Sequence, residues 1–344
     1  MTNQRGDGSA GAAAPRPEGP RIRRKRANAE REYARLRRQL LVRVYPRRLL
    51  SVYDNLQRVL FVHIPKCGGT SLRGNLVSDL RCLPVPANRG FVVEQCVTFM
   101  RRSAEGGTPQ RKLLESFTDM DTQGYSVPGY LRTLGAFHAL WRPTRTTLLG
   151  HQPARTLKRY FRPQRDLLLS VVRDPIDVLR SMVNYRVFHT LLNAHREDSR
   201  FLLKSMRMSE QHFRKLASDD PRQLTRALLT EVDFSLAGYL AMDKRTDCDT
   251  VWQGLRQHQV ILCHIDEQQA MLEQVFGIKL SGQFLNTSDE RDGLAATFAG
   301  ALQDDWLLEH VDKDSVALYQ RLSDKGVLGF WRQGGNLSDY RALL

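Results

Sequence analysis

One segment near the start of the chain constrains the fold more than any other, the run from Val59 to Leu72, which reads VLFVHIPKCGGTSL. An apolar, β-branched stretch stops at Pro65, and a lysine, two glycines and two hydroxyl residues follow. This order predicts a buried strand, a tight glycine turn and the start of a helix. Such a turn directs backbone N–H groups and the positive end of a helix dipole at one point, which suits a phosphate group.

The order of residues in this loop distinguishes two kinds of phosphate site. The nucleotide P-loop ends in Gly-Lys followed by Ser or Thr, and no Gly-Lys pair occurs in the 344 residues. In this chain the lysine precedes the glycines, and Pro-Lys-Cys-Gly-Gly-Thr-Ser closely resembles the 5′-phosphosulfate loop of sulfotransferases that use 3′-phosphoadenosine 5′-phosphosulfate (PAPS). The nearest resemblance is to carbohydrate sulfotransferases with an Ile-Pro-Lys-x-Gly-Gly-Thr loop. It implies that the donor is bound by Lys66, Cys67, Gly68, Gly69, Thr70 and Ser71. The alternative is an ordinary glycine-rich turn that binds no ligand.

A second apolar run, Leu167–Val172, leads into Arg173-Asp174-Pro175. Proline suits the first turn of a helix, so this segment also predicts a strand followed by a helix. In the sulfotransferase family, Arg-Asp/Asn-Pro with a serine at this spacing binds the 3′-phosphate of PAPS, and the resemblance gives that role to Arg173 and Ser181. A guanidinium group matches a phosphate bidentately, which makes the assignment chemically reasonable. The alternative is a local ion pair between Arg173 and Asp174, with Ser181 solvated.

Among the nine histidines, His151 is the candidate general base. A short β-type run, Thr146–Leu149, delivers it to a strand end beside a glycine. Sulfuryl transfer to a hydroxyl requires a base, and histidine suits that task near neutral pH. Similar carbohydrate sulfotransferases carry Gly-His between the two nucleotide motifs, which implies that His151 is the base and that Lys66 also stabilises the leaving group. A structural histidine at a strand end is the alternative, and His63 is interpreted as a core histidine hydrogen-bonded to backbone.

Strands that alternate with helices predict an α/β fold with a central parallel sheet flanked by helices, and with all three motifs at the carboxyl edge of the sheet. The resemblance implies the P-loop-NTPase-like sulfotransferase fold. Apolar recurrence at helical spacing predicts a helical insertion near residues 186–246, in which Ser209 is a helix N-cap. A strand at Val260–Ile265 and a helix at Glu267–Phe276 follow, and Phe284–Ser288 resembles a family segment that borders the nucleotide.

Positive charge is concentrated at the start of the chain. Residues 1–50 hold 14 Lys and Arg against 4 Asp and Glu, whereas the whole chain carries a net charge of +15. We predict that residues 1–50 form a disordered, arginine-rich extension and that residues 51–344 form the catalytic domain. The mild charge of that domain argues against specific nucleic-acid binding. Residues 21–48 are predicted to form either a basic helix on an anionic membrane or a solvated helix that packs lightly on the domain.

The location and metal content are also predicted. No apolar run approaches the ~20 residues of a membrane span, and the start of the chain lacks the apolar core of a signal peptide, so a cytoplasmic protein is expected. Five cysteines without Cys-x-x-Cys spacing argue for a reducing compartment without structural zinc, and no metal is expected. The glycine-rich tail from Gly326 receives no function.

The leading hypothesis is therefore a PAPS-dependent sulfotransferase that moves a sulfuryl group to an acceptor hydroxyl by in-line displacement, with a glycan as the preferred acceptor. A P-loop-like, ATP-dependent kinase is the alternative enzyme, and Arg173 with Ser181 weighs against it. The Asp-x-Asp pairs at Asp119–Asp121 and Asp247–Asp249 suggest a glycosyltransferase but are better interpreted as surface loops. A non-catalytic module that binds polyanions or membranes through the arginine-rich segment is the third hypothesis.

Overall fold

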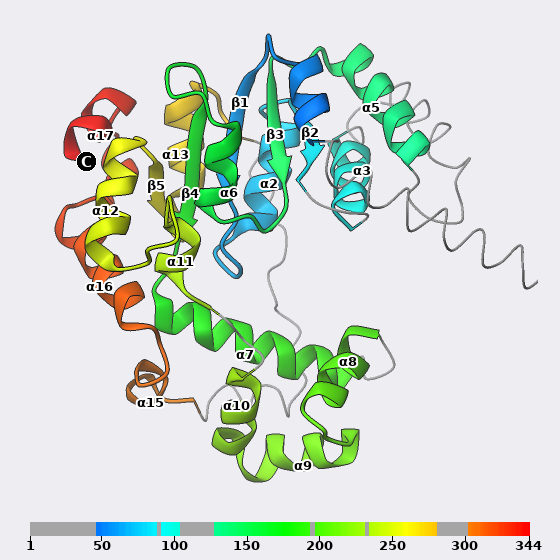
Figure 1. The fold of residues 1–344 in the computed structure, drawn as a ribbon, viewed down its shortest axis with the longest axis vertical. Coiled ribbons are helices and arrows are strands. Elements are labelled where there is room, and N and C mark those ends of the chain that lie inside the picture. The colour runs from blue at the N-terminus through cyan, green and yellow to red at the C-terminus, as the bar shows by residue number, and fades with distance from the viewer. Residues whose placement is uncertain (1–45, 88–90, 104–126, 193–196, 231–233, 281–301) are drawn as a thin grey trace, which may run out of the picture. The chain divides into compact units, whose positions relative to one another are not determined.

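The computed structural model describes residues 46–87, 91–103, 127–192, 197–230, 234–280 and 302–344. Five parallel strands form one sheet in the order β2-β3-β1-β4-β5 (Figure 1). The strands are β1 (Gln57–Val62), β2 (Cys82–Pro86), β3 (Arg145–Leu149), β4 (Leu167–Val172) and β5 (Ile261–His264). The predicted α/β class with a central parallel sheet is confirmed, as are a strand and a helix in the region from residue 260 to residue 276.

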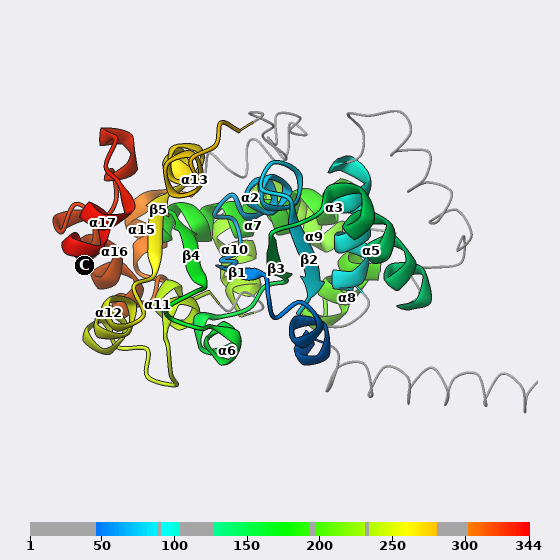
Figure 2. The same cartoon turned by 90° about the horizontal axis from the view of Figure 1, so that it is seen from above.

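The sheet is buried on both faces, which explains why its strands are continuous apolar runs rather than alternating patterns. In the central strand β1, residues 59–62 are almost completely inaccessible to solvent. Leu60 lies between Leu148 of β3 and Leu168 of β4 in the register of the sheet. Figure 2 shows α2 (Gly69–Ser78), α3 (Phe91–Ser103) and α13 (Gln268–Phe276) on one side of the sheet. Helices α6 (Ala154–Leu157), α11 (Leu236–Leu240) and α12 (Cys248–Gln257) lie on the other side.

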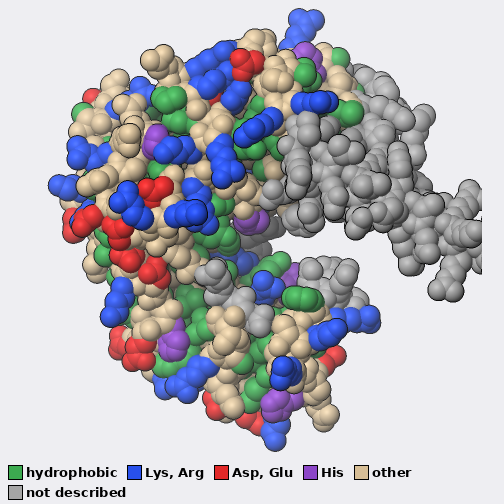
Figure 3. Space-filling model, in the orientation of Figure 1, with side chains coloured by type: hydrophobic (Ala, Val, Ile, Leu, Met, Phe, Trp, Pro, Cys, Tyr) green, Lys and Arg blue, Asp and Glu red, His purple; other side chains and the backbone are tan. Residues whose placement is uncertain are grey.

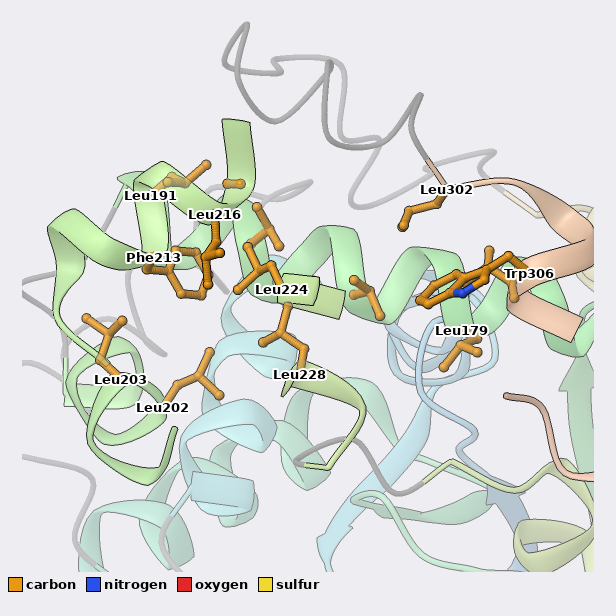
Figure 4. Close-up of a cluster of buried hydrophobic side chains, with 14 of the residues drawn as sticks. Leu179, Leu191, Leu202, Leu203, Phe213, Leu216, Leu224, Leu228, Leu302 and Trp306 are labelled. Atoms are coloured by element: carbon orange, nitrogen blue, oxygen red, sulfur yellow. The ribbon is translucent and has the colours of Figure 1, made fainter. Parts of the chain in front are cut away.

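The long helix α7 (Pro175–Leu192) leaves β4 and carries a group of helices that has its own apolar core. This group contains α8 (Glu197–Ser205), α9 (Glu210–Asp219), α10 (Pro221–Leu229) and α15 (Asp304–Leu308). Figure 4 shows the core side chains, among them Phe213, Leu224 and Trp306. The Ser209 hydroxyl accepts a hydrogen bond from the His212 N–H at 3.1 Å, so the predicted N-cap is confirmed.

The C-terminal tail covers the open edge of the sheet. Helix α5 (Val127–Trp141) flanks the β2 side, whereas η3 (Trp331–Gln333) and α17 (Leu337–Leu343) lie against β5. The indole N–H of Trp331 donates to the carbonyl of Leu262 at 2.8 Å. The Tyr340 hydroxyl accepts from the Leu262 N–H at 2.8 Å and donates to the carbonyl of Val260 at 3.1 Å. Because an edge strand exposes unpaired backbone groups, this tail, which the sequence left without a role, completes the sheet.

Several predicted segments lie wholly or partly outside the described residues. Residues 1–45, which include most of the arginine-rich segment, lie there, as do Asp119–Asp121 and Phe284–Ser288. Residues 46–52 are helical, and residues 46–50 of this helix fall within the predicted N-terminal extension. The helices that the structure describes are all too short or too polar to cross a lipid bilayer.

Candidate active site

The three sequence motifs lie at neighbouring strand ends. The loop after β1 contains Lys66, the residue after β4 is Arg173, and His151 follows β3 by one glycine. The connections after β1 and β4 run toward opposite edges of the sheet. From β1 the chain continues through α2 to the edge strand β2, and from β4 it continues through α7 to the other edge strand, β5. Ligands of open α/β sheets bind at such a switch point. Figure 3 shows that the molecular surface is hollowed between the sheet above and the helices α8–α10 below.

The loop after β1 is built to expose backbone N–H groups. Lys66 and Gly68 both have left-handed backbone conformations, with φ of 63° and 71°. Helix α2 begins at Gly69 with no side-chain cap and no acidic residue in its first turn. Thr70 is half-buried and Ser71 is buried in that turn. The positive end of the α2 dipole is therefore available to an anion.

Lys66 supplies a positive charge beside this helix start. Its ammonium nitrogen lies 3.3 Å from the centre of the Tyr185 ring on α7, a cation–π contact. Burial, and to a smaller extent the charge of Arg186, lower the pKa of Lys66 to about 8. Within the described ranges, Lys66 forms no ion pair with a carboxylate. Burial disfavours the charged form of Lys66, and no carboxylate in the described ranges pairs with it. An anion that binds beside Lys66 would therefore stabilise its positive charge.

Cys67 connects the loop after β1 to the loop after β4. Its side chain is buried, and its sulfur accepts a hydrogen bond from the backbone of Arg173. Burial raises the pKa of this thiol to about 12, outweighing the opposite effect of Arg173. The thiol is therefore protonated at neutral pH and is a poor nucleophile, so its contribution is to hold the two loops together.

Arg173 is half-exposed and lies near a carboxylate, but not the one that the sequence suggested. Its guanidinium nitrogen is 3.5 Å from the carboxylate of Asp177, one helical turn away. Asp174 instead caps α7, because its carboxylate accepts a hydrogen bond from the Ile176 N–H at 2.8 Å. Ser181 is half-buried on the same helix, two turns after Arg173. Asp177 also accepts a hydrogen bond from Arg180 at 2.7 Å, so its charge is shared.

His151 is partly accessible to solvent, and its ring stacks on that of His63 with a centroid distance of 3.8 Å and an interplanar angle of 23°. The sheet register explains the contact. Gln57 pairs with Arg145, and the same offset continued past the strand ends brings His63 level with His151. The prediction that His63 is buried is confirmed, because only 3 % of it is accessible. The predicted hydrogen bond to backbone is wrong for Nδ1, which has no partner in the described part of the chain.

A buried arginine, which the sequence analysis missed, completes the group. Arg73 of α2 is 3 % accessible, and its guanidinium donates to the Gly69 carbonyl at 3.2 Å and to the Gln95 side chain at 2.6 Å. Burial lowers the pKa of Arg73 to about 10, which still leaves it charged at neutral pH. Its position one turn after the loop glycines was the available signal, since a helix places residues i and i+4 on one face.

The protonation state of His151 follows from these neighbours. Its pKa is lowered to about 4, first by partial burial and then by the charge of Arg73. A hydrogen bond to the backbone of His63 opposes both effects. The ring is therefore neutral at pH 7, which is the state that a general base must have before it accepts a proton.

Other candidate chemistry finds no support in the described residues. They contain no group of three or more His, Cys, Asp and Glu side chains that could hold a metal ion. Asp247 caps α12 by accepting from the Thr250 N–H at 2.9 Å, and Asp249 pairs with Arg321 at 2.7 Å, so this Asp-x-Asp pair has structural roles. Comparison of the chain with family models, curated proteins and solved structures finds no match.

Proposed function

We propose that this protein is a PAPS-dependent sulfotransferase that transfers a sulfuryl group to an acceptor hydroxyl, with a glycan as the preferred acceptor. One observation carries the proposal: a neutral histidine and a cationic, glycine-rich helix start lie at adjacent strand ends and are linked through a single side chain, His63. The contact between Cys67 and Arg173 supports it further by bringing the second motif to the same loop.

The residues present fit the donor. The 5′-phosphosulfate would lie against the N–H groups at the start of α2 and against Lys66, while Arg173 and Ser181 would bind the 3′-phosphate. Arg173 would have to exchange Asp177 for that phosphate. The exchange costs little, because the pair is half-exposed and 3.5 Å apart, and such pairs contribute about 0–1 kcal/mol.

In the proposed reaction, His151 takes the proton of the acceptor hydroxyl while the hydroxyl oxygen forms a bond to sulfur. The bond from sulfur to the 5′-phosphate oxygen breaks, and the electron pair leaves with 3′-phosphoadenosine 5′-phosphate. Lys66 and the α2 dipole stabilise the negative charge that grows on this leaving group. As in phosphoryl transfer, positioning and electrostatics supply most of the rate enhancement.

The alternative proposals rest on fewer observations. An ATP-dependent kinase would need the Gly-Lys-Ser/Thr ending that the chain lacks. A polyanion- or membrane-binding role would depend on residues 21–48, and we keep peripheral contact with an anionic membrane as a secondary proposal. A cytoplasmic location without specific nucleic-acid binding is part of the same proposal.

A thermal-shift titration tests the donor assignment. The purified protein is titrated with 3′-phosphoadenosine 5′-phosphate, ADP or ATP in the absence of metal, alongside Arg173→Ala and a control, Arg256→Ala, on the exposed side of α12. We expect selective stabilisation by the 3′-phosphorylated nucleotide, which is weakened in Arg173→Ala and unchanged in the control. Equal stabilisation by ATP, or none by any nucleotide, would refute the proposal. A positive result leads to radiolabelled sulfate transfer with a panel of glycan acceptors.

A further inference from the structure

The imidazole of His63 lies between the glycine loop and the candidate base. Its edge occupies the space that a side chain at position 69 would need, since a Cβ on Gly69 would lie 1.9 Å from Cδ2 and 2.1 Å from Nε2 of His63. Its face stacks on His151 at 3.8 Å. Phe61 stacks near the same ring, with centroids 5.4 Å apart. One flat ring thus fills the whole gap between the loop and His151.

His63 holds His151 through ring stacking. The stacked rings restrict the tilt of the His151 side chain. His63 itself has little freedom, because it is buried at the end of the central strand and is confined by Gly69. Gly69 in the loop and the side chain of His151 therefore both pack against the ring of His63.

His63 is poorly suited to carry the proton itself. Two stacked imidazoles present faces to each other, so their ring nitrogens do not point at one another. Burial is the largest cause of a pKa far below the ordinary value for His63, followed by the charge of Arg73 and by His151. The ring therefore stays neutral, and its effect on its neighbours is steric.

We propose that His63 is a positioning residue whose flat ring sets the distance and orientation of His151 relative to the phosphate-binding loop. The proposal rests on the sulfotransferase function proposed above, in which His151 is the base. Reaction geometry is demanding, since a misplacement of about 1 Å can cost a factor of about 10² in rate. The loop binds the donor, and the rigid ring of His63 separates this loop from His151. The donor and the base therefore keep a fixed relative position.

Removal of the ring has a second, measurable consequence. The charge of Arg73 from α2 acts on both histidines, and Cys96 of α3 in turn interacts with Arg73. A smaller residue at position 63 leaves Arg73 and Cys96 in place but lets water reach the inner face of His151. Because burial is the main cause of the low pKa of His151, that pKa must then rise toward its ordinary value.

The test uses the full chain with His63→Phe, His63→Asn and His63→Leu. Phe keeps a flat ring without nitrogen, Asn keeps a polar group without a ring, and Leu fills volume without flatness. His138→Asn is the matched control, because His138 is an exposed histidine whose ring lies tilted beside that of Tyr53, with centroids 5.6 Å apart. We expect Phe to keep kcat within about threefold, and Asn and Leu to lower it by about tenfold or more with nearly unchanged KM for PAPS. A histidine NMR titration should place the pKa of His151 higher in the Asn variant than in the wild type, because Asn is smaller than His and lets water reach the ring.

Full activity in the Asn and Leu variants, with an unmoved His151 pKa in Asn, would overturn the proposal, and so would a Phe variant as inactive as Asn. Failure of the proposed function has a different signature. In that case the wild type neither binds 3′-phosphoadenosine 5′-phosphate nor transfers sulfate, while the NMR comparison of the Phe, Asn and Leu variants still shows whether His63 positions His151. Thermal melts of all variants identify any that do not fold, and the remaining ring-free variant then decides.

Discussion

Nucleotide binding should draw protons from solution onto Lys66. This side chain is held at a depressed pKa of about 8 by burial and by Arg186, instead of its ordinary value of 10.5. A bound phosphosulfate or phosphate supplies the negative charge that the loop lacks, and an opposite charge within contact distance favours the protonated amine. The pKa of Lys66 must therefore rise on binding, and affinity must fall as pH increases through about 8.

The size of this effect follows from the pKa of the unbound state. About half of the Lys66 side chains are neutral at pH 8, and about a tenth are neutral at pH 7. Binding should thus take up about 0.5 proton at pH 8 and about 0.1 at pH 7 if the bound lysine is fully protonated. His151 adds little at pH 8 because its pKa starts at about 4, and the nucleotide phosphates, with second pKa values of about 6, are already ionised there.

Isothermal titration calorimetry measures the uptake. The protein is titrated with 3′-phosphoadenosine 5′-phosphate at pH 8 in buffers of different ionisation enthalpy, and the slope of observed enthalpy against ionisation enthalpy is the number of protons exchanged. Lys66→Arg is the matched control, since an arginine stays charged throughout this range and should abolish the uptake. A wild-type slope near zero, proton release, or an equal slope in Lys66→Arg would refute the reasoning.

Three further predictions concern the base, the loop and the edge of the sheet. His151→Ala should lower kcat by about 10²-fold or more while nucleotide affinity changes by less than about threefold; a kcat above a tenth of wild type contradicts the base assignment. Gly69→Ala should lower the melting temperature and weaken nucleotide binding because its Cβ meets His63, whereas Gly135→Ala, with open space around its Cβ, should do neither. Tyr340→Phe should cost about 1–3 kcal/mol in urea unfolding, since it leaves buried backbone of β5 unpaired; an unchanged midpoint would show that the tail does not stabilise the edge.

Much of the fold could be predicted because the relevant signals are local. Buried parallel strands are continuous apolar runs, and some helix starts carry a capping residue such as Ser209; both signals lie in neighbouring residues. Within the predicted helical insertion, the structure separates α7, which ends at Leu192, from α8, which begins at Glu197. Apolar recurrence did not reveal this division, because both helices contribute to the same core.

The site divides along the same line. The sequence by itself determined the composition of the phosphate loop, the position of Arg173 at a strand end and the neighbourhood of His151, because each is a short segment with its own chemistry. Only the tertiary structure decided that His63 stacks on His151 and that Arg73 lowers the pKa of both histidines. The same holds for the hydrogen bonds of Trp331 and Tyr340 to the backbone of β5. These contacts join residues far apart along the chain, and they exist only once parallel register has aligned β1 with β3 and the tail has reached the open edge. Parallel strands are joined by long crossover connections, so the alignment of β1 with β3 is decided when the strands pack together and cannot be read from either segment alone.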